Sequence, residues 1–164
     1  MFVADIIIML NTLLFFHSMV RWAVLGTLLY AIYRSYKGCS GKLTFTKSDD
    51  FVRHWTATIA HIQLMLGIVL YTQSPNAKFT LHAIGTDGQI TQPFFFGVLH
   101  LLLMVSAIVI ITIGSAMAKR KPTDSGKFKT ILIWFGLALF IIFIAIPWPF
   151  SPLAQRPYLH SFNL

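Results

Sequence analysis

The sequence predicts an all-α integral membrane protein, an up-down-up-down bundle of four helices. Of its 164 residues, 56% are hydrophobic and only 11% are charged, whereas soluble domains carry about 25% charged residues. Four apolar runs are each long enough to cross a bilayer, which needs about 20 residues. We therefore expect a transmembrane domain over residues 1–149 and an outer-face tail over residues 150–164.

The first two helices are expected at roughly Ile6–Tyr33 and Phe51–Tyr71. The N-terminus has neither the basic region nor the small-residue cleavage site of a signal peptide, so the first run is expected to remain as a helix. Ser48, Asp49 and Asp50 form a helix-start signal before the second run. The residues between the two runs, 34–50, are predicted to form a loop.

The last two helices are expected at Pro93–Met117 and Thr130–Ile146. Pro93 suits the first position of a helix, where its missing N–H is not needed. Pro147-Trp148-Pro149 ends the fourth run. In the segment between the second and third runs, the alternating pattern of Lys78–Ala83 predicts a short hairpin.

The formal charge of +8 is concentrated in two of the segments between the runs. Basic residues lie between runs one and two and again between runs three and four: Arg34, Lys37, Lys42, Lys47, Lys119, Arg120, Lys121, Lys127 and Lys129. Basic loops stay on the cytoplasmic side, so both termini are expected on the outer side. The sequence has no basic-aromatic interleaving and no recognition motif, which argues against nucleic-acid binding.

His17, His61 and His100 lie in three different apolar runs. Counting about 1.5 Å per residue places all three in the outer half of the bundle. An ionisable side chain at such depth indicates a functional site, and two neutral imidazoles on facing helices are what one b-type haem requires. Copper or zinc bound by all three histidines is the alternative ligand, and interhelical hydrogen bonds without any ligand are the other.

Arg21 follows His17 by one helical turn, so both share a helix face. The chain contains no Glu, and all its acidic residues are predicted outside the hydrocarbon: Asp5, Asp49, Asp50, Asp87 and Asp124. The counter-ion of Arg21 is therefore expected to be a haem propionate, a lipid phosphate, a quinone oxygen or a partner subunit. Alternatively, Arg21 snorkels towards the interface or bonds backbone carbonyls and Gln63.

Several segments resemble a family of small four-helix membrane proteins of the Bacteroidota that are labelled cytochrome b-like. The matching segments are HSMVRW at 17–22, AHIQLMLGIVLY at 60–71, HLLLM at 100–104, ITIG at 111–114 and IPWP at 146–149. The resemblance spans nearly the whole chain and implies haem b in a bacterial cytoplasmic membrane. It marks as site residues His17, Arg21, His61, Gln63 and His100. The position before His100, often acidic in the family, is Leu99 here.

We therefore expect a protein of the cytoplasmic membrane that binds one haem b per chain and transfers electrons, rather than an enzyme in its own right. His61 is the expected first ligand, with His100 or His17 as the second. A quinone and other membrane subunits are the expected partners. The alternatives are a non-redox accessory subunit of a larger complex and a copper- or haem-handling assembly factor.

Overall fold

The computed structural model describes residues 2–73 and 94–148, and side chains from residue 6 onwards. The described helices are α1 (Phe2–Ser40), α2 (Lys47–Gln73), α4 (His100–Arg120), which continues from the π-helical turn η2 (Phe95–Leu99), and α5 (Asp124–Ala145). No strand occurs in the described ranges. The all-α, up-down-up-down bundle is confirmed, whereas Pro93, the hairpin predicted at Lys78–Ala83 and the tail at residues 150–164 lie outside the described residues.

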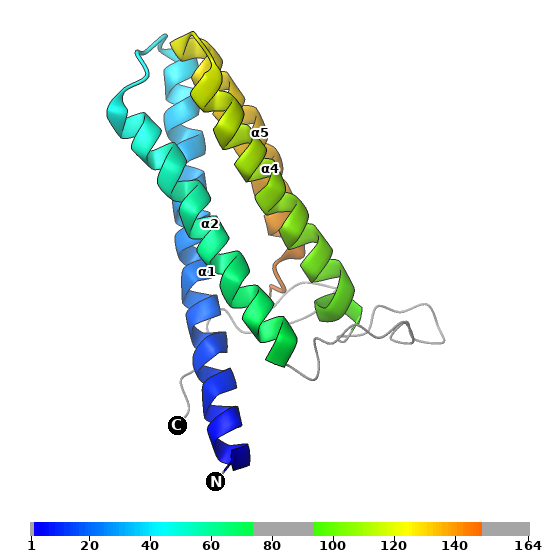
Figure 1. The fold of residues 1–164 in the computed structure, drawn as a ribbon. Coiled ribbons are helices and arrows are strands. Elements are labelled where there is room, and N and C mark those ends of the chain that lie inside the picture. The colour runs from blue at the N-terminus through cyan, green and yellow to red at the C-terminus, as the bar shows by residue number, and fades with distance from the viewer. Residues whose placement is uncertain (1, 74–93, 149–164) are drawn as a thin grey trace.

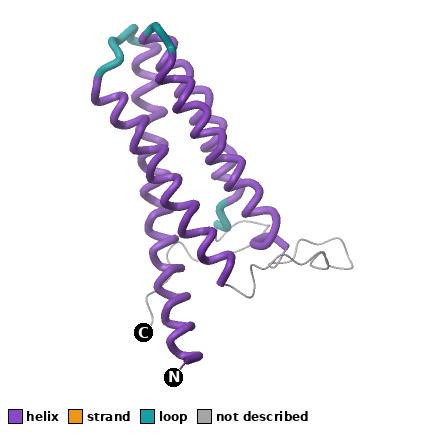
Figure 2. The backbone as a smooth tube through the Cα atoms, viewed as in Figure 1, coloured by secondary structure: helices purple, strands orange, loops and turns teal. Residues whose placement is uncertain are grey.

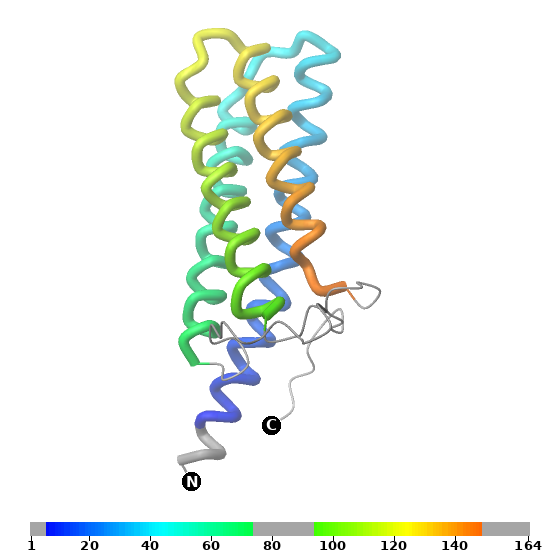
Figure 3. The backbone as a smooth tube through the Cα atoms, turned by 90° about the vertical axis from the view of Figure 1, so that its right-hand side faces the viewer, coloured from blue at the N-terminus to red at the C-terminus, as the bar shows by residue number. Residues whose placement is uncertain are grey.

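The four long helices pack as a closed ring (Figure 1). α1 contacts α2 and α5, and α4 contacts the same two helices, so α1 and α4 stand diagonally opposite each other. The two short described connections lie at one end of the bundle, opposite the N-terminal end of α1 (Figure 2). We call the end with these connections the loop end. Viewed from the side, α4 and α5 run next to each other along their whole length (Figure 3).

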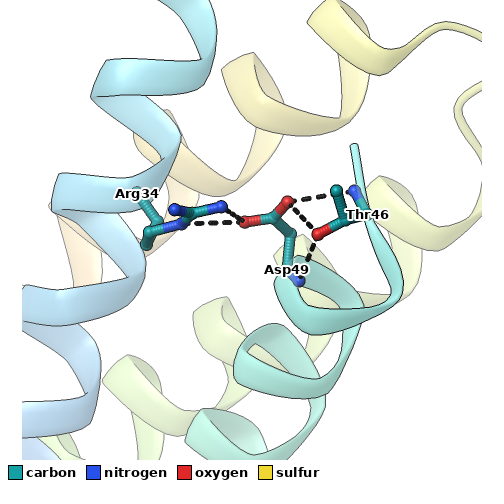
Figure 4. Close-up of polar contacts among 3 residues, drawn as sticks. All are labelled: Arg34, Thr46 and Asp49. Atoms are coloured by element: carbon teal, nitrogen blue, oxygen red, sulfur yellow. Dashed lines mark hydrogen bonds and ion pairs between the residues drawn. The ribbon is translucent and has the colours of Figure 1, made fainter. Parts of the chain in front are cut away.

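The start of α2 is fixed by a reciprocal cap between Thr46 and Asp49 (Figure 4). Asp49 Oδ2 accepts hydrogen bonds from Thr46 N and Oγ1 at 3.0 and 2.7 Å, and Thr46 Oγ1 accepts one from Asp49 N at 3.3 Å. The arrangement is a capping box with Asp in the place of Glu. The other oxygen of the buried Asp49 carboxylate pairs with Arg34 on α1 at 2.8 Å. The start signal predicted at Ser48 is thus two residues late, because Thr46 is the capping residue.

The first helix is longer than predicted at its C-terminal end. Residues 34–40, expected in the loop, continue α1, and Arg34 on this extension bonds to Asp49 at 2.8 Å. The helix ends where Lys42 adopts a left-handed backbone with φ of 48° and Leu43 N–H returns to Gly38 O at 3.1 Å. That hydrogen bond closes the helix as in a Schellman motif, and only residues 41–46 remain as the connection.

The helix α5 begins earlier than predicted and packs closely against α4. Thr123 caps α5 by accepting a hydrogen bond from Gly126 N at 3.2 Å, so α5 begins six residues before the predicted Thr130. Further along, a Cβ built on Gly114 would clash with Trp134 Cβ. Only glycine allows the two backbones this close, as is common for helices that pack in lipid.

All four helices are long and apolar enough to cross a membrane. Their outward faces carry large exposed side chains, among them Met65 at 62%, Leu102 at 60% and Phe140 at 64% exposure. The interior holds fully buried Leu28 and Phe135. Apolar residues on both the inside and the outside are the distribution that a helix bundle surrounded by lipid requires.

The close contact at Gly114 predicts that the same substitution, glycine to alanine, changes the free energy of unfolding differently at Gly114 and at Gly136. Gly114→Ala places a methyl group against Trp134 and is expected to lower the free energy of unfolding by about 1–3 kcal/mol. Gly136→Ala, on α5, meets nothing within 4 Å and is expected to be neutral or to stabilise by up to about 1 kcal/mol through helix propensity. Unfolding in detergent micelles measures both. Equal losses would contradict the close packing.

Candidate functional site

A cavity of about 300 Å³ lies between the four helices, near the end opposite the loop end. Its volume is at the lower limit of ordinary small-molecule sites, about 300–1,000 Å³. Most of its lining is apolar, including Leu14, Met104 and Ile142. The polar or ionisable side chains that line it are His17, Ser18, Arg21, Gln63, Tyr71 and His100. The structure therefore brings together four of the five residues predicted for the site.

Hydrogen bonds from Gln63 on α2 determine which ring nitrogen of His17, on α1, carries the proton. The amide nitrogen of Gln63 donates to the backbone oxygen of His17 at 3.0 Å and lies 3.3 Å from Nε2 of the same residue. Only the NH₂ group can donate to a carbonyl, so the orientation of the Gln63 amide is determined. Its second N–H then points to Nε2, which must accept. In neutral His17 the ring proton is therefore on Nδ1.

Two buried polar atoms of this pair have no protein hydrogen bond. Within the described part of the chain, neither His17 Nδ1 nor Gln63 Oε1 has a partner. His17 contributes a donor and Gln63 an acceptor, both on side chains that line the cavity. Nearly all buried polar groups in proteins are hydrogen-bonded. A donor and an acceptor left over beside one cavity are therefore suited to a polar ligand.

His100, at the start of α4, carries its ring proton on the same nitrogen as His17 but uses that proton in a hydrogen bond. Its Nδ1 donates to the backbone oxygen of Ala145, in the last turn of α5, at 2.8 Å. That oxygen has no helical partner, because the residue four positions further on is Pro149, which lacks an N–H. The hydrogen bond leaves Nε2 as the lone-pair atom of the His100 ring. Metal-binding histidines are commonly held in this way, through the nitrogen that does not bind the metal.

The backbone just before His100 is a π-helical turn. The N–H of His100 bonds to the oxygen of Phe95, one residue further back than in an α-helix. The rings of Phe95 and Phe96 lie 5.9 and 6.1 Å from the His100 ring. Single π turns inside helices are frequent at functional sites. Here the turn packs two aromatic rings against the imidazole.

Arg21 gives the cavity a permanent positive charge. It lines the cavity, half-buried, and its guanidinium lies 5.7 Å from the Trp22 ring. It is within electrostatic range of both His17 and His100. None of the described residues that line the cavity is acidic. An anionic group of a ligand would therefore be attracted to this side of the cavity.

His61, the expected first ligand, stands apart from this cavity. It is exposed on the outer surface of the bundle, and both ring nitrogens are engaged: Nδ1 with Ala57 O at 2.7 Å and Nε2 with Thr112 Oγ1 at 3.2 Å. Thr112 is three turns, about 18 Å of helix rise, from His100. Among the described residues, no three His, Cys, Asp or Glu side chains are grouped to hold a metal. The three-histidine copper or zinc site is therefore not formed.

Helix geometry explains why His61 and Gln63 separate. Two residues along an α-helix are about 200° apart, so the two side chains point to nearly opposite sides. Gln63 bonds to His17 in the interior, so His61 must face outwards. The pairing of Gln63 with His17 and the cavity contacts of Ser18 and Tyr71 were not predicted. Ser18 and Tyr71 carry no distinctive sequence signal.

These contacts predict that His61 has a structural role. We expect its hydrogen bond to Thr112 to contribute to the free energy of unfolding. Thr112→Val removes the contact with His61 and the bond from Thr112 Oγ1 to Ile108 O. Thr58→Val is the matched control, because the Thr58 hydroxyl bonds only within its own helix, to His54 O. We expect Thr112→Val to cost about 0.6 kcal/mol more than the control. Equal unfolding free energies for the two variants would show that the His61 contact contributes nothing.

No protein-family model, no curated protein and no solved structure matches this chain.

Proposed function

We propose that the protein binds haem b in this cavity, with His100 as a ligand of the iron, and that it transfers electrons in the membrane. The observation that carries the proposal is the meeting of His17, Arg21 and His100 at one cavity. These residues come from α1 and α4, the diagonal pair of helices. The resemblance to cytochrome b-like proteins supports the same ligand.

The residues present fit the chemistry of a haem. His100 offers an imidazole whose second nitrogen is held by Ala145 O. Arg21 offers a planar guanidinium, which suits a propionate carboxylate. The remaining lining is largely aliphatic and aromatic, as the apolar porphyrin faces need. When bound, the haem iron would supply a one-electron change between its ferric and ferrous forms.

The chain's own residues would set the properties of that centre. The carbonyl of Ala145 fixes the ring of His100 and increases the basicity of its free nitrogen. The positive charge of Arg21 favours the more electron-rich state and so raises the reduction potential. Leu101, Met104 and Ile108 line the same cavity and limit the access of water.

The setting that we propose is the bacterial cytoplasmic membrane, with both termini on the periplasmic side. It rests on the basic residues of the loop end, which stay on the cytoplasmic side under the positive-inside rule. The cavity would then lie in the outer half of the membrane. One centre near one face does not carry electrons across the bilayer, so its partners would be a quinone pool, an outer-face protein or other membrane subunits.

Colour tests the proposal directly. The protein purified from haem-supplied cells is expected to show reduced-state haem absorption at one haem per chain. His100→Ala should lose these bands because the ligand is gone, whereas His61→Ala, the matched control on the outer surface, should keep them.

A colourless wild type would contradict haem binding and favour an accessory subunit. Copper in place of haem on metal analysis would favour an assembly factor. Loss of the bands in His61→Ala but not in His100→Ala would place the iron ligand on α2 and contradict its assignment to His100.

The orientation has a separate test at Cys39, the single cysteine, near the loop end of α1. In intact cells it should react with a membrane-permeant maleimide and resist an impermeant one, because the loop end is cytoplasmic. Cells made permeable provide the positive control. Labelling of intact cells by the impermeant reagent would reverse the topology.

A further inference from the structure

The two cavity histidines share one tautomer, with the ring proton on Nδ1, but they differ in what occupies Nε2. His100 donates through Nδ1 to Ala145 O, which leaves Nε2 as a free lone pair. His17 accepts at Nε2 from Gln63, which leaves Nδ1 carrying the proton. A metal binds the unprotonated nitrogen of a neutral imidazole. His100 offers that atom, whereas the unprotonated Nε2 of His17 already accepts a hydrogen bond from the Gln63 amide.

Gln63 holds His17 through two hydrogen bonds. The single amide nitrogen of Gln63 contacts both the backbone oxygen and the ring of His17. On the same face of α2, one turn away, Gly67 lies against the ring: a Cβ there would be 3.4 Å from His17 Cε1. Releasing Nε2 for a metal would break one hydrogen bond and leave a buried amide N–H without its acceptor, which is costly.

From these contacts we infer that Gln63 is a positioning residue that keeps His17 off the iron, so that the cavity binds a small uncharged diatomic molecule beside a haem with one histidine ligand. The inference rests on the proposed haem. His100 is the ligand of the iron, and His17 Nδ1–H is the hydrogen-bond donor to the diatomic molecule. Among the described residues the buried Nδ1–H of His17 has no partner, so a bound diatomic molecule could accept a hydrogen bond from it.

The state of His17 can be measured first without any haem. In haem-free protein labelled with ¹⁵N-histidine, we expect the His17 signals to report the Nδ1–H form. Gln63→Met removes the amide while keeping an unbranched side chain, and it should shift His17 towards the Nε2–H form. Gln73→Met, the same change at an exposed position at the end of α2, should leave the signals as in the wild type. An Nε2–H form in the wild type would overturn the inference.

The haem-loaded protein gives the second readout. With carbon monoxide as the probe, the ferrous wild type is expected to be high-spin and to bind the gas. Gln63→Met should become low-spin and lose most of its carbon monoxide binding, because the amide no longer occupies His17 Nε2 and the ring can bind the iron through that atom once its proton moves to Nδ1. Gln73→Met should remain high-spin.

His17→Leu keeps the test decisive if Gln63→Met does not fold. Because His17 is not a ligand, the variant should stay high-spin and still bind carbon monoxide, with a shifted C–O stretching frequency from the lost hydrogen bond. A low-spin wild type that ignores carbon monoxide and turns high-spin in His17→Leu would overturn the inference while leaving haem binding intact. A colourless wild type would instead refute the proposed function.

Discussion

The constraint on which this structure depends is that polar side chains inside an apolar bundle must find their partners on neighbouring helices. Hydrogen bonds between neighbouring helices meet this requirement on three sides of the ring. Gln63 joins α2 to α1 through His17, Arg53 joins α2 to α4 through Ser115 O at 3.1 Å, and His100 joins α4 to α5. Each bond satisfies a group that would otherwise be costly to bury. The same bonds decide which nitrogen of each histidine remains available.

The two ends of the bundle differ in how their interiors are filled. At the loop end, the Arg34–Asp49 pair and the buried Phe128, which packs edge-on against Phe45 at 5.0 Å, close the interior. At the other end the cavity separates the helices. The histidines of the cavity are all carried by helices, which hold side chains in fixed orientations more accurately than loops do.

The number, order and direction of the helices could be predicted from the sequence, because runs of apolar residues separated by basic segments leave little choice. The positions of the helix ends could not be predicted from the sequence, because Thr46 and Thr123 act as caps through contacts that the apolar pattern does not reveal. His17, Arg21 and His100 were found because ionisable residues are rare in apolar runs, whereas Gln63 was marked as a site residue by the family resemblance. The separation of His61 was missed because helices that are apolar on all sides give no clear signal of which face points inwards. The π turn before His100 has no sequence signature either.

The most direct measurement is an experimental density map of the protein purified with haemin. The account predicts density in the cavity lined by His17, Arg21, Gln63 and His100, with the iron bound to Nε2 of His100 and the Gln63 amide still on His17. It would be contradicted by haem density at the outer surface beside His61, or by a cavity closed by its own side chains.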